Sequence, residues 1–253
     1  MTEKELFEEL CAAASYRVCD VDSDSGIGIY NEKRLHRILK ATFCQSEDCF
    51  EVKVGRYIAD IATEDRIIEI QCGLFLPLKK KIEYYLENTD YSVLIVHPLI
   101  VKRTIIRADR ESGEIMRMRT SPKRPTEWNV LAKLYPIAEL LGSDRVSLKI
   151  MLVEAEEYRY SEAVRYRKKG KYDSELFPTR LRDSILLSSK EDYRRFLPDG
   201  LPKGEFTAAD FAPLVPLRGM DVYSALNSLS AIGLLEREKT GGRVRYKCKE
   251  KTI

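Results

Sequence analysis

The chain has 253 residues, of which 44% are hydrophobic and 33% are charged, and its formal net charge is +3. This length and composition allow one large or two small domains with a buried core, which argues against extended disorder. No apolar run reaches the roughly 20 residues of a membrane-spanning helix, and the first ten residues are acidic and amphipathic rather than a signal peptide. We therefore expect a cytoplasmic protein with no membrane partner.

The cysteine count and the distribution of charge narrow the function classes. The six cysteines include no C-x-x-C pair and the chain has only two histidines, so a closed zinc site has few ligands and we expect buried free thiols. Residues 1–60 hold 8 Lys/Arg against 12 Asp/Glu, whereas residues 158–182 hold 8 against 3. One chain thus combines an acidic region suited to a cation with a basic region suited to a polyanion.

The first hundred residues predict two helices, three short strands, a helix and a buried strand. The acids at 20–24 alternate as in a calcium loop, but Ser25 and Asn31 occupy the positions of its Gly and Glu, so we expect an acidic turn. Asn31 is then a plausible N-cap for the second helix. From apolar periodicity, the elements are a helix over 3–14, strands over 51–54, 57–62 and 66–71, a helix over 76–88 and a strand over 91–98.

The next hundred residues predict a hairpin, a helix, a strand and a basic stretch. The hairpin over 101–119 turns at Ser112-Gly113, and a basic linker with two prolines follows it. A helix over 127–141 and a strand over 146–154 come next. The basic, tyrosine-containing stretch 158–182 is expected to be a mobile connection or a solvated face that suits phosphates and unstacked bases.

The last fifty residues have a pattern of their own. Thr207 and Asp210 form a capping-box-like helix start, Gly233 ends a second helix, and Gly241-Gly242 turns a hairpin whose second arm alternates basic residues. The succession of helix, turn, helix and basic hairpin resembles a winged-helix domain.

Two carboxylates fall on neighbouring predicted strands. Glu69 and Gln71 share one face of their strand, and Asp60 on the previous strand points to the same side if the two strands pair as a hairpin. Carboxylates that close repel each other and raise one pKa unless a cation is present. Mg²⁺ or Mn²⁺ would resolve the conflict by accepting carboxylate, water and phosphate oxygens.

In this order of elements, residues 28–98 resemble the core of the PD-(D/E)XK nuclease superfamily, which includes restriction endonucleases and Holliday-junction resolvases. The resemblance implies an α/β fold with a restriction endonuclease-like mixed sheet flanked by helices. It implies that Asp60, Glu69 and the backbone carbonyl of Ile70 bind the metal. It places Gln71 where the family lysine helps to position the attacking water, and Glu32 as an additional acid.

This chain departs from the family pattern at Gln71, which cannot carry a positive charge or act as a general base. Lys53 on the preceding strand and Lys79 and Lys80 on the following helix are candidates for the missing cation. Simpler structural interpretations stay open for four other residues. They are Asp60 as a salt-bridge partner of Arg56 or Arg66, Glu32 as a complement to the helix dipole, His36 as a helix-surface residue and His97 as a strand-end residue.

The C-terminal resemblance implies a second contact with DNA. With its apolar face inward, the second helix leaves polar residues outside, where such a helix enters the major groove. These residues are Arg218, Asp221, Ser224, Asn227 and Ser228. Arg243, Arg245 and Lys247 would reach phosphates from the hairpin.

The sequence therefore predicts a nuclease-like domain over residues 1–200 and a winged-helix domain over 201–253. The expected function is magnesium-dependent hydrolysis of DNA phosphodiester bonds, with a homodimer as a possible assembly. The principal alternative is a DNA-binding or regulatory protein whose nuclease fold is catalytically inactive. A third alternative is a protein-interaction module that binds no nucleic acid.

Overall fold

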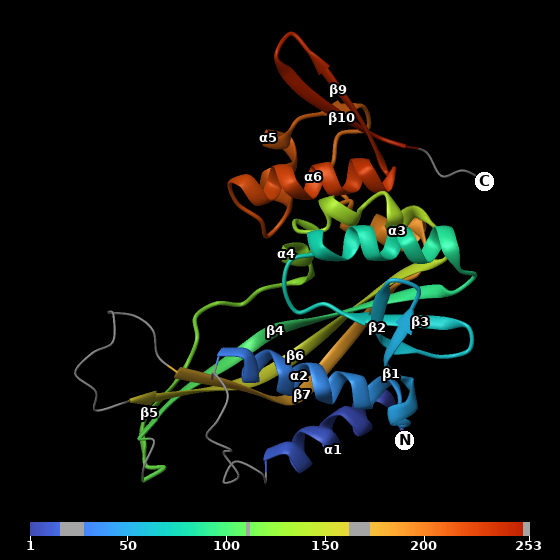
Figure 1. Ribbon diagram of the computed structural model, residues 1–253. Helices are drawn as coiled ribbons and strands as arrows, with labels where there is room; N and C mark the ends of the chain where they lie inside the picture. The colour runs from blue at the N-terminus through green and yellow to red at the C-terminus, as the bar shows by residue number, and fades with distance from the viewer. Residues whose placement is uncertain (16–27, 110–111, 162–172, 250–253) are drawn as a thin grey trace. The chain divides into compact units, whose positions relative to one another are not determined.

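The computed structural model describes residues 1–15, 28–109, 112–161 and 173–249, and its main feature is a large mixed β-sheet flanked by helices (Figure 1). The prediction of an α/β fold with a mixed sheet is confirmed at this level. The acidic segment at 20–24 and the central part of the basic stretch, 162–172, lie outside the described residues.

The helical elements are short apart from α1, α2 and α6. The α-helices are α1 (Glu3–Ser15), α2 (Gly28–Phe43), α3 (Lys79–Asn88), α4 (Glu127–Leu131), α5 (Ala208–Phe211) and α6 (Met220–Ile232). The 3-10 turns are η1 (Glu47–Cys49), η2 (Leu76–Leu78), η3 (Tyr135–Ile137), η4 (Leu140–Gly142), η5 (Lys190–Phe196) and η6 (Ala212–Leu214). Among the described residues, no helix has the length and apolar character that a membrane span requires.

The strands form two sheets within the described residues. They are β1 (Phe50–Val54), β2 (Tyr57–Ala62), β3 (Arg66–Ile70), β4 (Ser92–Asp109), β5 (Ile115–Thr120), β6 (Val146–Ser161), β7 (Asp173–Leu187), β8 (Glu205–Phe206), β9 (Leu235–Thr240) and β10 (Arg243–Cys248). The large sheet has the order β1-β2-β3-β4-β6-β7, with β5 paired to β4, and the small sheet has the order β8-β10-β9.

Strand β3 lies between an antiparallel and a parallel neighbour. It pairs antiparallel with β2 through Ile61↔Ile68 and parallel with β4 over Arg66–Ile70 and Ser92–Val96. Its residues after Arg66 are all buried, as expected for a strand that is covered on both faces. This double pairing fixes the direction in which Glu69 points.

The chain divides into two compact units, and each is assembled from three separate segments. One unit contains residues 1–50, 98–124 and 151–184, and the other contains residues 51–97, 125–150 and 185–253. In the first unit α1 packs on α2, and the Arg34 guanidinium on α2 lies 4.2 Å from the ring centroid of Phe177 on β7. The expected division into a domain over residues 1–200 and a domain over 201–253 remains a prediction.

Residues 205–249, which we call the C-terminal module, contain α5, η6, α6 and the small sheet. Thr207 and Asp210 form the expected capping box at the start of α5, because the Asp210 carboxylate accepts the Thr207 N–H and the Thr207 hydroxyl, each at 2.8 Å. Gly233 ends α6 in the left-handed conformation. Gly241 and Gly242, with φ of 59° and 82°, turn the β9–β10 hairpin. These three local predictions are confirmed.

Other predicted elements differ from the structure. The strand expected over 91–98 and the first arm of the hairpin expected over 101–119 form one continuous strand, β4. Helix α2 begins at Gly28, so Asn31 lies inside it and is not its N-cap. The predicted helix over 127–141 is wrong, because α4 ends at Leu131 and only two short 3-10 turns follow it. The first of them contains Pro136, which lacks an N–H and so cannot continue a helix. The end of the predicted mobile connection is the strand β7, in which Phe177 and Leu181 are buried.

The turn between β1 and β2 depends on Gly55. Its φ is +59°, and a Cβ atom at this position would lie 1.9 Å from the Tyr84 hydroxyl oxygen. Tyr84 is held in turn by the Tyr57 ring, at a centroid distance of 5.4 Å, and by the Arg56 guanidinium, 4.9 Å from its ring centroid. A larger residue at 55 therefore disturbs α3 as well as the turn.

We predict that Gly55→Ala lowers the free energy of unfolding more than Gly241→Ala does. Gly241 has the same φ of +59° but no atom within 4 Å of the added Cβ, so its substitution reports the backbone strain alone, about 1 kcal/mol. Displacing Tyr84 should add about 1–3 kcal/mol at Gly55. Urea unfolding of the two variants measures the difference, and equal losses would contradict the close contact.

Candidate functional site

Strands β2 and β3 bring the two predicted carboxylates together at the end of their backbone ladder. The paired residues are Ile61↔Ile68 and Ala62↔Ile67. At the next position the Oδ2 of Asp60 accepts the backbone N–H of Ile70 at 2.8 Å. The Asp60 side chain thus bonds to the β3 backbone directly. Opposed residues of an antiparallel pair share a face, so this register places Asp60 and Glu69 on the same side, as predicted.

Glu69 is buried beneath α3, with 1% of its surface exposed. Its Oε2 accepts a hydrogen bond from Lys81 Nζ at 2.6 Å, and its Oε1 accepts one from the Tyr85 hydroxyl at 3.1 Å. Lys81 and Tyr85 are four residues apart on α3 and therefore lie on one face of the helix. We call Asp60, Glu69, Lys81 and Tyr85 the carboxylate site.

The electrostatics of the site follow from this burial. The pKa of Glu69 is raised to about 7, mainly by burial and to a smaller degree by the charge of Asp60, while Lys81 and the Tyr85 hydroxyl oppose the change. Burial and the neighbouring Glu69 also raise the pKa of Tyr85, so its hydroxyl keeps its proton and acts as a donor. A buried carboxyl group that titrates near neutrality is a common property of functional sites.

The turn after β3 is fixed by Gln71 and His97. The Gln71 side-chain amide donates to the Leu74 carbonyl at 2.6 Å, and the Gln71 carbonyl lies 2.5 Å from His97 Nδ1. Since a carbonyl only accepts, Nδ1 carries the proton. Burial lowers the pKa of His97 to about 4, so the ring is neutral at pH 7, and it packs on Phe75 with a centroid distance of 5.0 Å. The interpretation of His97 as a strand-end residue is wrong, because β4 continues past it to Asp109.

Two further residues were predicted to belong to this site, Ile70 and Glu32. Ile70 is buried and gives its N–H to Asp60. Glu32 belongs to α2, and its side chain lies outside the described part of the chain. Arg66 and Arg56 are the alternative salt-bridge partners considered for Asp60. Arg66 Nε bonds to Ser92 Oγ at 3.4 Å, and the Arg56 guanidinium lies over the Tyr84 ring.

Lys81 is a residue of the carboxylate site that the sequence does not indicate. The sequence offers Lys53, Lys79 and Lys80 as the missing cation, but the side chain that contacts Glu69 is that of Lys81, which is only 18% exposed. Lys79 pairs instead with Glu83 on the surface of α3 at 3.9 Å. The spacing of four residues between Lys81 and Tyr85, beside the apolar Ile82, is the signal that would have found it.

The donor set of the carboxylate site fits a divalent cation in chemical type. Asp60 and Glu69 offer hard carboxylate oxygens, the ligands that Mg²⁺ and Mn²⁺ prefer, and each oxygen can accept more than one partner. A cation would relieve the effect of Asp60 on the Glu69 pKa. The described residues hold no cluster of three or more His, Cys, Asp and Glu side chains, so a cation here needs backbone or substrate oxygens as well.

In the C-terminal module most of the predicted contact residues are accessible. Arg218, Arg243, Arg245 and Lys247 are exposed, and Ser224 and Asn227 are half-buried. The prediction for Ser228 is wrong: it is fully buried, and its hydroxyl donates to the Ser224 carbonyl at 3.0 Å. Helical spacing explains this, because Ser228 lies three residues after Ala225 and four before Ile232, both of which are core residues.

Two of the three basic residues proposed for the hairpin, Arg245 and Lys247, face acidic partners. Arg245 Nη1 bonds to Glu205 Oε2 at 2.7 Å, and this ion pair raises the pKa of Arg245. In the register of the small sheet, Arg245 is opposite Glu238 and Lys247 is opposite Glu236. Cross-strand pairs of opposite charge stabilise a sheet, so part of this positive charge is already balanced within the module.

Comparison with known proteins places the central part of the chain in a family. The model of a domain of unknown function, DUF8091, matches residues 33–188, which is more than half of the chain. The chain belongs to the DUF8091 family. The matched DUF8091 region contains the whole carboxylate site and ends before the C-terminal module.

One relative and the solved structures complete the comparison. An uncharacterized protein of Treponema pallidum (strain Nichols) is 28% identical over 176 residues, which make up 66% of this chain and 64% of the relative. The matched region thus spans slightly less than two thirds of the relative's length. No solved structure matches the chain.

We predict that acid destabilises the protein through His97. Its pKa is about 4 when folded and about 6.5 when unfolded, so between these values the unfolded chain binds more protons. This contribution to stability is fully present above about pH 6.5 and decreases as the pH falls toward 4, by up to about 3 kcal/mol. Urea unfolding of the wild type and His97→Asn, whose amide can still donate to Gln71, at about pH 7.5 and pH 4.5 measures it. A stability difference that does not change with pH would contradict this prediction.

Proposed function

We propose that this chain is a metal-dependent nuclease that hydrolyses DNA phosphodiester bonds. The observation that carries the proposal is the convergence of Asp60 on β2, Glu69 on β3 and Lys81 on α3. Two acids and one cation at this position are the residue types that the PD-(D/E)XK resemblance requires. The cation comes from α3 instead of position 71.

The order of the elements supports the same proposal. A helix, three strands, a second helix and a fourth strand follow one another as α2, β1, β2, β3, α3 and β4. Strand β4 is parallel to β3, and α3 covers the side of β3 that bears Glu69. This succession agrees with a restriction endonuclease-like core.

Each residue of the site has a proposed role. Asp60 and Glu69 would hold Mg²⁺ or Mn²⁺, with the Ile70 carbonyl as a further ligand, and the bound ion would polarise the phosphodiester and activate a water molecule. Lys81 would present its ammonium to the negative charge that develops on the phosphate, the part that Gln71 cannot take. The Tyr85 hydroxyl keeps the Glu69 carboxylate in place. Gln71 would orient water, and Glu32 remains a proposed additional acid.

The C-terminal module is proposed to act as a winged-helix domain that binds DNA. Its small sheet follows the order β8-β10-β9, and α5 and α6 precede the β9–β10 hairpin. Arg218, Ser224 and Asn227 would contact DNA from the α6 side, and Arg243 and Lys247 from the hairpin. Arg245 would have to exchange Glu205 for phosphate, so we assign it a smaller part.

A second candidate function is DNA binding without catalysis. It is favoured by the 2.6 Å contact between Lys81 and Glu69, because an ammonium that already neutralises the carboxylate competes with a metal ion. In that case the carboxylate site would be structural. The two functions differ in whether a divalent ion binds.

The test begins with calorimetric titration of Mg²⁺ and Mn²⁺ into the wild type, Asp60→Asn and Lys81→Met, followed by incubation with supercoiled and branched DNA. We predict that Asp60→Asn loses both metal binding and cleavage. Lys81→Met should keep metal binding and lose about 100-fold or more in cleavage rate. Lys79→Met is the matched control, because its partner Glu83 is exposed and the substitution should leave both properties unchanged.

The outcomes separate the two functions. Salt-dependent DNA binding by the wild type without metal binding or cleavage would reject the nuclease and favour the non-catalytic binder. Metal binding should also release protons near pH 7, since the raised pKa of Glu69 leaves it partly protonated there. The heat of binding should therefore differ between buffers of different ionisation enthalpy.

A further inference from the structure

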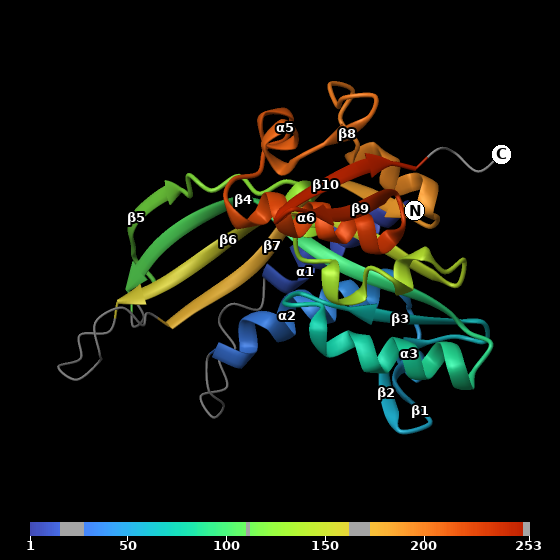
Figure 2. The same cartoon turned by 90° about the horizontal axis from the view of Figure 1, so that it is seen from above.

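The outer part of β4 and its partner β5 form a two-stranded ribbon at the edge of the large sheet. The paired residues run from Thr104↔Thr120 to Ala108↔Ile115, and we call residues 104–109 and 115–120 the β4–β5 ribbon. Figures 1 and 2 both show β5 beside the outer end of β4. All six residues of β5 are exposed, including Met116 and Met118 at 64% and 57%. Both faces of this strand are therefore accessible.

The ribbon concentrates positive charge. Arg107 is directly opposite Arg117, and Arg119 follows two residues later on the same face of β5. Like charges placed directly opposite each other destabilise a sheet. Within the described residues Arg117 and Arg119 form no hydrogen bond or ion pair, and residues 98–124 hold 8 Lys/Arg against 3 Asp/Glu. An anion at this face would relieve the repulsion.

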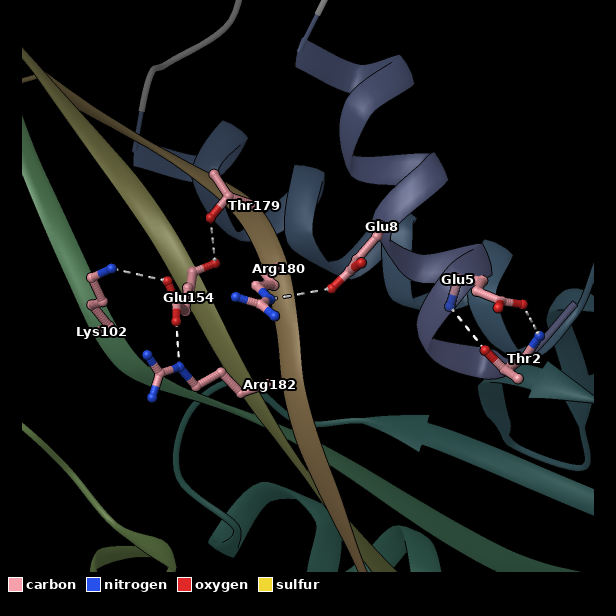
Figure 3. Close-up of polar contacts among 8 residues, drawn as sticks. All are labelled: Thr2, Glu5, Glu8, Lys102, Glu154, Thr179, Arg180 and Arg182. Atoms are coloured by element: carbon pink, nitrogen blue, oxygen red, sulfur yellow. Dashed lines mark hydrogen bonds and ion pairs between the residues drawn. The ribbon is translucent and has the colours of Figure 1, made fainter.

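On the neighbouring strands β4, β6 and β7, basic side chains form ion pairs with glutamates. Lys102 and Arg182 converge on Glu154 from the strands on either side of it, with Lys102 Nζ 3.2 Å from Glu154 Oε2 (Figure 3). Glu157 also holds two cations, Arg103 from β4 at 3.1 Å and Arg159 from its own strand β6 at 2.8 Å. Each glutamate thus neutralises two cations of the sheet. Against this pattern, the arginines of β5 stand out as cations that the described fold does not neutralise.

We propose that the β4–β5 ribbon binds the phosphate backbone of a nucleic acid duplex. The proposal deepens the proposed function and rests on it, because it adds a second contact with the same substrate. A two-stranded ribbon fits the major groove of DNA, and arginine donates to phosphate oxygens with its planar guanidinium. Contacts of this kind position a duplex without reading its sequence. Met116 and Met118 alternate with the arginines and so lie on the opposite face of β5, which leaves the arginine face to the phosphates.

The test compares two double variants that remove the same charge. Arg117→Gln/Arg119→Gln removes the unneutralised arginines of the ribbon, and Lys4→Gln/Lys203→Gln removes two exposed lysines elsewhere. Fluorescence anisotropy with a short DNA duplex in EDTA, at several salt concentrations, gives the Kd without cleavage. The ribbon variant should bind about tenfold or more weakly at about 0.1 M salt, and its slope of log K against log salt should be smaller by about 2. The control should stay close to the wild type.

Each result decides the proposal. Equal binding by the two double variants would overturn the ribbon as a contact, whether or not the wild type cleaves DNA. Weakened binding by the ribbon variant alone, in a protein that never cleaves DNA, would reject the nuclease and leave the ribbon supported. Loss of binding to anionic phosphatidylserine vesicles, with DNA binding unchanged, would assign the surface to a membrane and overturn the proposal. Unfolding midpoints confirm folding, since removing like charges should not destabilise the sheet.

Discussion

The burial of one carboxylate, that of Glu69, organises the part of the chain where the candidate chemistry lies. A carboxylate taken out of water is unfavourable unless it is hydrogen-bonded and paired. Here α3 supplies both partners, Lys81 and Tyr85, from a single helical face. The position of α3 over β3 therefore follows from this requirement. The Asp60 bond to the Ile70 backbone then holds the second carboxylate next to the first.

A buried ion pair seldom stabilises a core more than apolar side chains of similar volume, because removing two charges from water is unfavourable. The Lys81–Glu69 pair is thus weak evidence for stability and stronger evidence for a use. A carboxyl group with a pKa of about 7, beside an ammonium and a second carboxylate, can respond to a cation or to a phosphate. The neutral His97 ring holds the adjoining turn through its hydrogen bond to the Gln71 carbonyl and adds no charge to the site.

The sequence predicted what local signals determine. Apolar alternation located β1, β2 and β3, and glycines with capping residues located the turns of the C-terminal module, since these signals act within a few residues. The sequence did not predict β7, because its buried Phe177 and Leu181 are four residues apart with the polar Thr179 and Arg180 between them, so the strand lacks a simple apolar alternation. Nor did it choose Lys81 among three consecutive lysines. That choice depends on the rotation of α3 relative to the sheet, which only long-range packing determines.

The division of the chain into interleaved segments constrains how the protein can form. Strands β4 and β6 each begin in the unit that contains residues 51–97 and continue in the unit that contains residues 98–124. During synthesis, neither unit has all its segments until the ribosome has passed residue 184. Contacts between segments far apart in sequence slow folding, and strand edges stay unpaired until the later segments have been synthesised. The emerging chain should therefore depend on chaperones, and no cut in β4 or β6 would release an intact half.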